Sequence, residues 1–260
     1  MRDILLHNRD AWDNEASRTG PWSTPVSAEV IEEARQGRWE VGLTPTIPVP
    51  GHWVTPVKGL DILALASGGG QQGPVLAAAG ASVVVYDLSP GQLEKDQEVA
   101  DRYSLDLRTV EGDMTDLSAF PEDSFDMVFN PGSNMYVENI LAVWSEAYRV
   151  LRPGGTLLVG FNNPCLYIFD WHSHMAGEFV VRHRLPFSDL HDLPKKERQA
   201  YLDEGLALEY SHTFNEQIGG QLAAGFELLG FFEDAQPGFA IGDYMPTAFA
   251  SWARTSKGRS

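Results

Sequence analysis

The feature that most constrains how this chain folds is a regular alternation of short apolar runs and longer amphipathic segments between residues 60 and 162. The apolar runs at 60–66 and 82–87 are unbroken, which is typical of strands buried on both faces of a parallel sheet. The segments between the runs have the composition and the capping residues of helices. Strands that alternate with helices predict an α/β fold, in which a mostly parallel, doubly wound sheet carries helices on both faces.

The same pattern gives the expected elements. Ser27 and Ser89 stand where helix N-caps are needed, and Gly37 can end the helix that Ser27 begins. The prolines of "LTPTIPVPGHWVTP" at 43–56 predict an extended loop. The sequence predicts helices at 7–16, 26–37, 71–80, 89–103 and 138–151, and strands at 60–66, 82–87, 105–113, 125–130, 155–163, 226–234 and 247–254.

The composition divides the chain into two parts. Residues 1–58 are rich in Trp and Pro and have little strand pattern, so we expect an N-terminal cap of helix and loop. Residues 59–260 then form the main domain. The alternation stops at about Asn163, and the stretch to about residue 218 holds clustered aromatics and five histidines. Residues 165–218 are therefore predicted to be an insert after the fifth strand.

Charge and cysteine content limit the partners and the compartment. The net charge of −17 repels a phosphate backbone, so no nucleic-acid partner is expected. The single cysteine, Cys165, rules out an intrachain disulfide and fits a reducing compartment. No apolar run approaches the ~20 residues of a membrane helix, and the apolar stretch in "MRDILLHNRD" is too short for a signal peptide. We therefore expect a cytoplasmic protein without a membrane span.

A glycine run follows the first expected strand. In "LASGGGQQGP", Gly68, Gly70 and Gly73 fit the G-x-G-x-x-G pattern of loops that hold the pyrophosphate of NAD. Asp87 ends the second strand, 19 residues after Gly68, where an acid can meet a ribose hydroxyl. Any ligand that contains adenosine can use such an acid. None of the five lysines follows a Tyr at the four-residue spacing of short-chain dehydrogenases, so NAD is the weaker alternative.

Four segments occur in an informative order: "DILALASGGGQQG", "VVVYDLSPGQLE", "VEGDMTDLSAFPEDSFDMVFN" and "EAYRVLRPGGTLLVG". Over residues 60–162 the chain resembles a class I S-adenosylmethionine-dependent methyltransferase, of the small-molecule kind similar to quinone-biosynthesis methyltransferases. The resemblance implies a Rossmann-like, seven-stranded sheet whose last strand is antiparallel. It also implies in-line displacement of a methyl group onto a small-molecule oxygen, nitrogen or carbon nucleophile, which leaves S-adenosylhomocysteine. A non-catalytic S-adenosylmethionine-binding protein and an NAD-dependent oxidoreductase are the alternatives.

The resemblance also implies roles for particular residues. Asp87 would accept both ribose hydroxyls, Asp113 would bind the adenine amine with Met114 beside the ring, and Asn130 would face the methionyl part. Ala64 stands where the family usually carries an acid that supports the glycine loop. The expected cofactor contacts are Ala66, Ser67, Gly68, Gly70, Gln72, Asp87, Leu88, Gln92, Asp113, Met114 and Asn130.

The methyl acceptor is expected beneath the insert and beside the N-terminal helix. Aromatic side chains there can wall an apolar pocket, and a histidine can act as a general base because its usual pKa is near 6.5. Since the sulfonium is already an activated methyl donor, no catalytic residue is assigned, and neither a metal ligand nor an oligomeric state is proposed. The expected acceptor contacts are Trp12, Tyr136, Trp171, His172 and His174.

Overall fold

The computed structural model describes residues 2–18, 20–54 and 56–258 of the chain. In this described part, the strands form one seven-stranded sheet in the order β3-β2-β1-β4-β5-β7-β6. Neighbouring strands are parallel except for β7, which lies antiparallel between β5 and β6. The predicted topology is therefore confirmed. The strands are β1 (Asp61–Leu65), β2 (Ser82–Asp87), β3 (Leu107–Glu111), β4 (Phe125–Asn130), β5 (Leu151–Asn162), β6 (Phe226–Asp234) and β7 (Ala248–Thr255).

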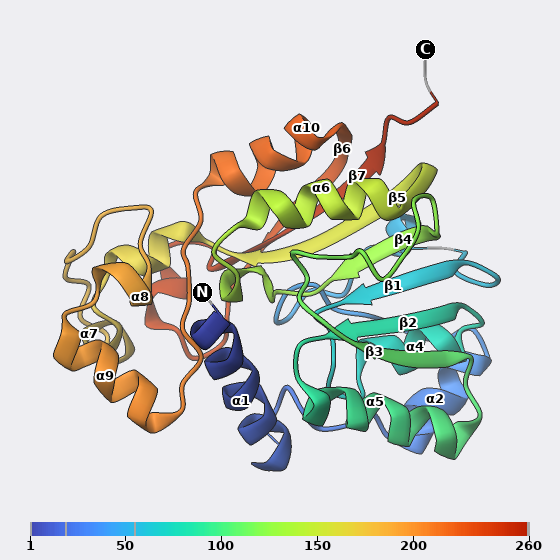
Figure 1. Cartoon of the computed structure of the whole chain (residues 1–260), viewed down its shortest axis with the longest axis horizontal. Helices are drawn as coiled ribbons and strands as arrows, with labels where there is room; N and C mark the ends of the chain where they lie inside the picture. The colour runs from blue at the N-terminus through green and yellow to red at the C-terminus, as the bar shows by residue number, and fades with distance from the viewer. Residues whose placement is uncertain (1, 19, 55, 259–260) are drawn as a thin grey trace.

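Helices cover both faces of the sheet. In Figure 1, α2, α4 and α5 lie on one side of it, and α6 and α10 lie on the other. Shorter helical turns are η1 (Asn134–Tyr136), η2 (Pro164–Ile168), η3 (Asn215–Gly219) and η4 (Ala240–Asp243). The α-helices are α1 (Arg2–Arg18), α2 (Ala28–Arg35), α3 (Gly51–Val54), α4 (Gln72–Ala78), α5 (Pro90–Tyr103), α6 (Ile140–Val150), α7 (Trp171–Met175), α8 (Asp189–Asp192), α9 (Lys195–Glu204) and α10 (Gly220–Ala224).

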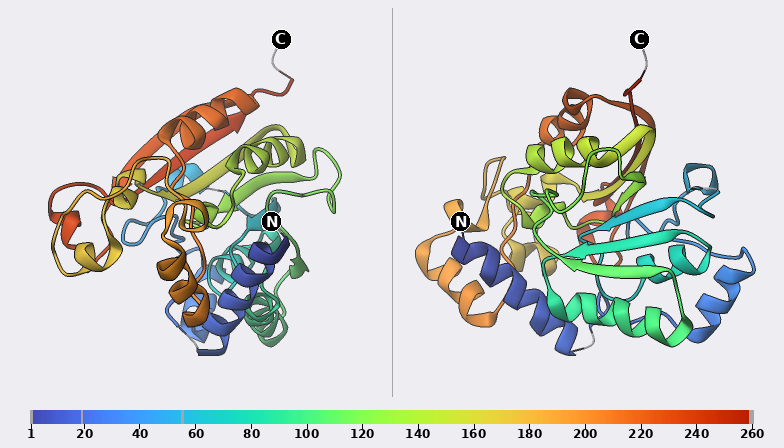
Figure 2. Two further views of the ribbon diagram at one scale, coloured as in Figure 1. Left: turned by 60° about the vertical axis from the view of Figure 1, so that its left-hand side comes forward. Right: turned by 45° about the vertical axis from the view of Figure 1, so that its right-hand side comes forward.

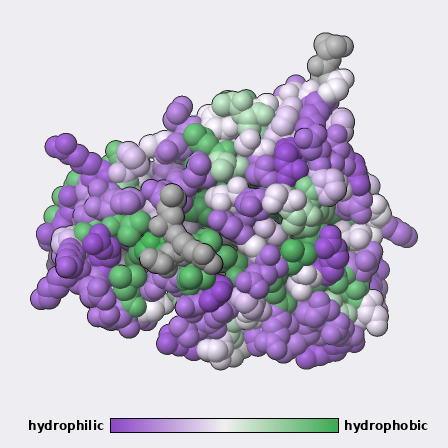
Figure 3. Space-filling model, in the orientation of Figure 1, coloured by the Kyte–Doolittle hydropathy of each residue, from purple (hydrophilic) through white to green (hydrophobic). Residues whose placement is uncertain are grey.

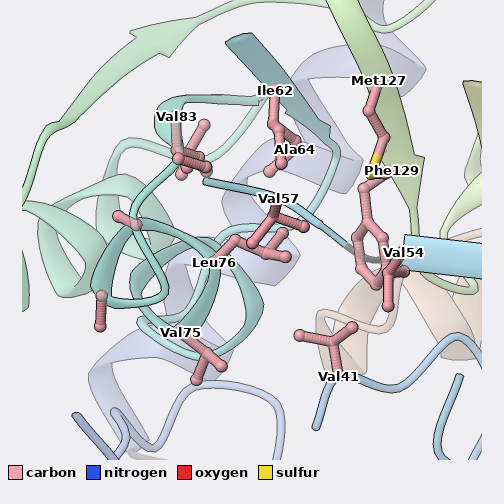
Figure 4. Packing of buried hydrophobic residues seen from close by; sticks show 14 of the residues in the cluster. Val41, Val54, Val57, Ile62, Ala64, Val75, Leu76, Val83, Met127 and Phe129 are labelled. Carbon is pink, nitrogen blue, oxygen red and sulfur yellow. The ribbon is translucent and has the colours of Figure 1, made fainter. Parts of the chain in front are cut away.

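The central strand β1 shows why the strands are unbroken apolar runs. Ile62 and Ala64 pack into one core cluster, which also contains Val83 and which Figure 4 shows from close by. Leu63 and Leu65 pack into a second cluster. Successive side chains of a strand point to opposite faces, so both faces of β1 are buried.

Two sequence expectations differ from the structure. The proline-rich stretch at 43–56, of which residue 55 lies outside the described residues, contains the short helix α3 as well as extended chain. Pro50 allows this turn because proline is tolerated at a helix start, and its carbonyl accepts the N–H of Trp53 at 2.8 Å. The insert, predicted without helices, contains α7, α8 and α9. The helices α7 and α8 are capped by the side chains of Asp170 and Ser188.

Helix α1 joins the sheet to the insert. Figures 1 and 2 show α1 between α5 and the segment that carries α7–α9, on the side to which the arrows of β1 and β2 point. Asp13 Oδ1 accepts hydrogen bonds from Ser89 Oγ (2.6 Å) and Gly91 N (2.9 Å) at the start of α5. The side chain of Asn8 pairs with both backbone groups of Leu208 in the insert. These contacts close α1 over the carboxyl ends of the strands.

One face of the molecule is mainly polar. Hydrophilic residues cover most of the face shown in Figure 3, with smaller hydrophobic patches among them, as the net charge of −17 leads one to expect. Among the described residues, no helix has the length and apolar character needed to cross a membrane.

Candidate active site

A cavity of about 560 Å³ lies at the carboxyl ends of the parallel strands. This volume falls within the range of pockets that hold small ligands, roughly 300–1,000 Å³. Residues from the N-terminal segment, the glycine loop, the ends of β2, β3 and β4, the insert and the β6–β7 loop all line it. Among them are nine of the predicted cofactor residues: Ala66, Ser67, Gly68, Gln72, Asp87, Leu88, Gln92, Asp113 and Met114.

The glycine loop needs glycine for two different reasons. A Cβ on Gly68 would lie 2.7 Å from Gln92 Cβ and 3.1 Å from Asp87 Oδ2, so the wall of the cavity has no room for it. A Cβ on Gly73 would lie 2.7 Å from Val85 Cγ2, which means that this glycine allows α4 to pack closely on β2. Gly73 therefore has a packing role, and it does not line the cavity.

A buried carboxylate on α5 supports the same loop. Asp96 Oδ2 accepts hydrogen bonds from the backbone N–H groups of Gly69 (2.9 Å) and Gly70 (3.1 Å), and the residue is 0% exposed. Burial raises the pKa of Asp96 to about 8, although the two N–H groups lower it. Although Ala64 stands where the family usually carries an acid, the loop is not without one, because Asp96 supplies a carboxyl group from a neighbouring helix.

Asp87 and Asp113 bring carboxylates into the cavity from the ends of β2 and β3. Asp87 accepts hydrogen bonds from Gly68 N at 2.9 Å and from Ser89 N at 3.0 Å. Burial raises the pKa of Asp87, and these N–H groups partly oppose the rise. Asp113 Oδ1 accepts the N–H of Thr115 at 2.9 Å. Each carboxylate is fixed by backbone groups and keeps lone pairs that a ligand can use.

Ser67 Oγ and Gln92 Oε1 are among the polar atoms of the cavity wall that are buried without a hydrogen-bond partner in the described residues. The amide nitrogen of Gln92 donates a hydrogen bond to Ser23 Oγ at 2.7 Å. This bond fixes the orientation of the amide and leaves its oxygen without a partner. Buried polar atoms are normally paired. The two atoms therefore fit a site built for a polar ligand.

Several predicted residues are not brought to the cavity. Asn130 is 0% exposed, and its Nδ2 donates to Leu65 O (2.9 Å) and Ser133 Oγ (2.8 Å), so it fixes the end of β4. Gly70 faces Pro25 rather than the cavity. The three predicted residues of α7 also lie outside the lining. These three are Trp171, His172 and His174.

The α7 residues form an aromatic cluster instead. His174 is 1% exposed and stacks on Phe169, with Trp171 and Phe239 at ring-centroid distances of 5.9 and 5.5 Å. Burial lowers the pKa of His174. His172 is exposed. Since Phe239 lines the cavity, the cluster supports a wall of the cavity from behind.

Trp12 and Tyr136 do line the cavity, and their rings meet edge to face at 5.2 Å. The insert contributes two lining residues that the sequence did not reveal, Leu166 and Glu209. Glu209 lies on a short extended segment with no motif around it. Only contacts with residues far away in the sequence bring it to the cavity.

The electrostatics of the cavity favour an adenosine ligand without phosphates. Of the described residues that line it, three are acidic and none is Lys, Arg or His. A pyrophosphate would meet uncompensated negative charge there, whereas a cationic sulfonium would be stabilised. The acids at the ends of β2 and β3, Met114 beside Asp113 and the close approach at Gly68 fit S-adenosylmethionine.

The fold and the cavity together define a class I S-adenosylmethionine-dependent methyltransferase. Residues 63–159 match the family described as "Methyltransferase domain". A Bacillus subtilis protein described as the uncharacterized methyltransferase YbaJ is 45% identical over 251 residues, which cover 96% of this chain and 98% of that protein. The chain therefore belongs to this methyltransferase family and uses S-adenosylmethionine.

Two further proteins illustrate the likeness. The demethylmenaquinone methyltransferase of Clavibacter sepedonicus is 42% identical over 109 residues, which span 41% of this chain and 42% of that protein. The crystal structure of an S-adenosylmethionine-dependent methyltransferase from Mesorhizobium loti matches this chain with a TM-score of 0.60 and 20% sequence identity. The matched region covers 78% of this chain and 94% of the Mesorhizobium loti chain. The predicted resemblance is confirmed.

Proposed function

We propose that this enzyme methylates a small-molecule oxygen, nitrogen or carbon nucleophile. One observation supports the proposal: a single cavity of about 560 Å³ is lined both by Asp87 and Asp113 and by apolar side chains such as those of Trp12, Tyr136 and Phe161. Pockets of this size and character take small ligands. The absence of cationic side chains from the described lining also disfavours a phosphate-bearing acceptor.

In this proposal the cofactor lies along the glycine loop. Asp87 accepts the ribose hydroxyls, Asp113 accepts the adenine amine, and Met114 packs beside the adenine ring. Ser67 Oγ and Gln92 Oε1 offer the remaining polar contacts. The support is that these residues all line the cavity and that the last two atoms are buried without partners among the described residues.

When bound, S-adenosylmethionine supplies a methyl group activated for in-line displacement by a positively charged sulfur. The residues of the cavity hold the acceptor in line and keep water out, which together can lower the barrier by several kcal/mol. Trp12 and Tyr136 form an apolar corner suited to this task, because their rings pack directly on each other.

We also propose that residues 1–58 act as a cap and residues 165–218 as an acceptor-side insert. Trp12 and Thr44 line the cavity from the first segment, and Leu166 and Glu209 line it from the second. The free cysteine, Cys165, fits the reducing cytoplasm, where we place the enzyme.

Calorimetric titration with S-adenosylmethionine, S-adenosylhomocysteine and NAD tests the cofactor assignment. We expect the first two to bind and NAD not to bind. Asp87→Ala should weaken S-adenosylmethionine binding by about 2–4 kcal/mol, because each hydrogen bond to a charged group contributes about 1.5–3 kcal/mol. Unchanged affinity in a folded Asp87→Ala variant would contradict the role of this acid.

Transfer of a radiolabelled methyl group to a panel of phenols, quinols and amines tests the acceptor class. Quinols are included because one relative is named a demethylmenaquinone methyltransferase. Labelling of at least one panel member is the expected result. Labelling of nucleic acid or protein, with every small molecule unlabelled, would overturn the proposal.

A further inference from the structure

One carboxylate of the cavity is not explained by the cofactor. Glu209 belongs to the insert, and it lines the cavity together with Leu166 of the same segment. Its Oε2 accepts a hydrogen bond from the hydroxyl of Tyr167 at 2.5 Å. Within the described residues, no Lys, Arg or His forms an ion pair with Glu209. The acceptor region therefore has a carboxylate without a counter-charge.

Hydrogen bonds hold the backbone of Glu209 and of the preceding residue, Leu208, in place. The side chain of Asn8 in α1 donates to Leu208 O (3.0 Å) and accepts from Leu208 N (2.9 Å), and it is 2% exposed. Asp189 Oδ2 accepts the N–H of Glu209 at 2.9 Å, and Asp189 N donates to Glu209 O at 3.1 Å. Two elements far apart in the sequence thus fix the position from which the Glu209 side chain reaches the cavity.

The surroundings also prepare this carboxylate to exchange a proton. Burial raises the pKa of Glu209 to about 7; the hydrogen bond from Tyr167 lowers it, and the negative charge of Asp189 raises it further. Such a group is partly ionised near neutral pH, where a general base is most effective. The hydroxyl of Tyr167 is held in turn by Asn162 Nδ2 at 3.5 Å.

We propose that Glu209 binds the methyl acceptor through an N–H or O–H group and receives its proton, so that the acceptor is an amine or a hydroxyl compound on an apolar body and not an anion. The apolar body fits the walls formed by Trp12, Tyr136 and Phe161. An anionic acceptor would face a carboxylate in a cavity whose described lining offers no cation. The inference rests on the proposed function, since it assigns the acceptor half of the same site.

The proposed step is balanced. The lone pair of the acceptor nitrogen or oxygen forms the bond to the methyl carbon, and the electrons of the broken carbon–sulfur bond remain on sulfur. The proton of the acceptor passes to the Glu209 carboxylate, which becomes a neutral acid. Tyr167 acts as a positioning residue, because it holds one carboxylate oxygen by its hydroxyl.

Three one-ring probes test the assignment without knowledge of the natural acceptor. The affinities of benzylamine, phenol and benzoate are measured by calorimetry or ligand-observed NMR on protein saturated with S-adenosylhomocysteine. We expect benzylamine and phenol to bind at least tenfold more tightly than benzoate. Glu209→Gln should reduce the benzylamine affinity at least tenfold, and it should reduce the phenol affinity less, because an amide oxygen still accepts a hydrogen bond. Glu204→Gln, at the exposed end of α9, is the matched control.

The pH dependence of benzylamine binding gives an independent measurement. The titratable groups that face Glu209 are Tyr167 from η2, Tyr136 from η1, Asp189 from α8 and Tyr201 from α9. Affinity for the cationic probe should rise with pH through the Glu209 titration at about 7. In Tyr167→Phe, which retains the carboxylate, the midpoint should move to higher pH because the hydrogen bond that lowers this pKa is removed.

The possible results distinguish a failure of the proposed function from a failure of the inference about Glu209. If the wild type does not bind S-adenosylhomocysteine, the proposed function fails. If it does bind, equal affinity for benzoate and benzylamine overturns the inference, and so does a benzylamine preference that survives Glu209→Gln. A tenfold loss of S-adenosylhomocysteine affinity in Glu209→Gln would place this residue in the cofactor half and would also overturn it. Should Glu209→Gln fail to fold, the midpoint in Tyr167→Phe decides.

Discussion

At the scale of single residues, the carboxyl group that supports the glycine loop comes from a helix and not from the strand before the loop. Ala64 is 0% exposed and packs in the core, where a carboxylate would be costly. Asp96 performs the task from α5 by accepting the N–H groups of Gly69 and Gly70. The two positions are 32 residues apart in the sequence, and the helical pattern of 89–103 gave no sign that one of its acids points inward.

Asp96→Ala should lower the free energy of unfolding by about 2–6 kcal/mol, because two buried N–H groups lose their acceptor at about 1–3 kcal/mol each. Asp96→Asn keeps an acceptor oxygen and should affect stability far less at neutral pH. Chemical denaturation of both variants checks this ordering, and Asp101→Asn on the exposed side of α5 is the control. Similar losses for Ala and Asn at position 96 would contradict the role of the oxygen.

The pH dependence of the same variants gives a second check. The folded-state pKa of Asp96, about 8, lies above its ordinary value of 3.8. Between these values the folded protein holds a proton that the unfolded chain has released, so the stability contributed at this site falls as the pH rises. The slope approaches about 1.4 kcal/mol per pH unit for one proton. Wild-type stability should fall more steeply than that of Asp96→Asn between about pH 5 and pH 8.

Gly68 is the loop position most sensitive to an added methyl group. In Gly68→Ala the new Cβ would lie 2.7 Å from Gln92 Cβ and 3.1 Å from Asp87 Oδ2, so two cofactor-side residues must shift. We expect S-adenosylhomocysteine affinity to fall more than tenfold, about 1.4 kcal/mol, in a folded protein. Gly51→Ala, where a Cβ meets nothing within 4 Å, should bind normally. Near-normal affinity of Gly68→Ala would show that the cofactor does not approach this turn.

At the scale of elements, how well the sequence predicts a helix or strand depends on how the side chains of that element are buried. The strands at 82–87, 125–130 and 226–234 match their predicted limits. In the first two, the apolar runs record that both faces are buried. The insert was harder to predict, since α7 and α8 span five and four residues. Helices this short depend on tertiary contacts rather than on an amphipathic pattern.

The same distinction separates the two halves of the active site. Asp87 and Asp113 could be predicted because parallel strands bring their carboxyl ends to one edge of the sheet. Glu209 could not, because it reaches the cavity through its own pairings with Tyr167, 42 residues away, and Asp189, and through the pairing of the neighbouring Leu208 with Asn8. The histidines of α7 were predicted as acceptor contacts only because a histidine can act as a general base. The structure places His174 in the aromatic cluster.

His174→Phe tests that structural role. Both ring nitrogens of His174 are buried without partners among the described residues, and burial lowers its pKa below the ordinary 6.5. At acid pH the unfolded chain therefore binds a proton that the folded protein does not, and stability falls as the pH drops below about 6.5. His174→Phe should remove this loss, so thermal unfolding should show a smaller decrease in Tm from pH 7 to pH 5 than in the wild type.

The control for this experiment is His172→Phe, because His172 is exposed on the same helix. It should retain the pH dependence of the wild type. Cofactor affinity should stay within about threefold in His174→Phe, since the His174 side chain does not line the cavity. A large loss of S-adenosylhomocysteine binding would instead show that His174 belongs to the binding site.

At the scale of the whole molecule, the cavity unites segments from most of the chain. The N-terminal helix, the sheet, the insert and the β6–β7 loop each contribute to its wall, and α1 is hydrogen-bonded both to α5 and to the insert. A ligand in this cavity therefore contacts, directly or through α1, the N-terminal segment, the carboxyl edge of the sheet, α5 and the insert, which Figure 2 shows around the same region. Binding should stabilise these segments together rather than one of them alone.

S-adenosylhomocysteine should accordingly raise the Tm of the whole chain in a single transition. A ligand that binds only the folded state at 100 times its Kd contributes about 2.7 kcal/mol. For a protein of this size each kcal/mol shifts Tm by about 2–4 °C, so we expect a shift of roughly 5–10 °C by calorimetry. NAD at the same concentration should leave Tm unchanged, because its pyrophosphate meets an acidic lining without a described cation. Two separate transitions, one of them insensitive to S-adenosylhomocysteine, would show that the cap or the insert unfolds independently and does not close the site.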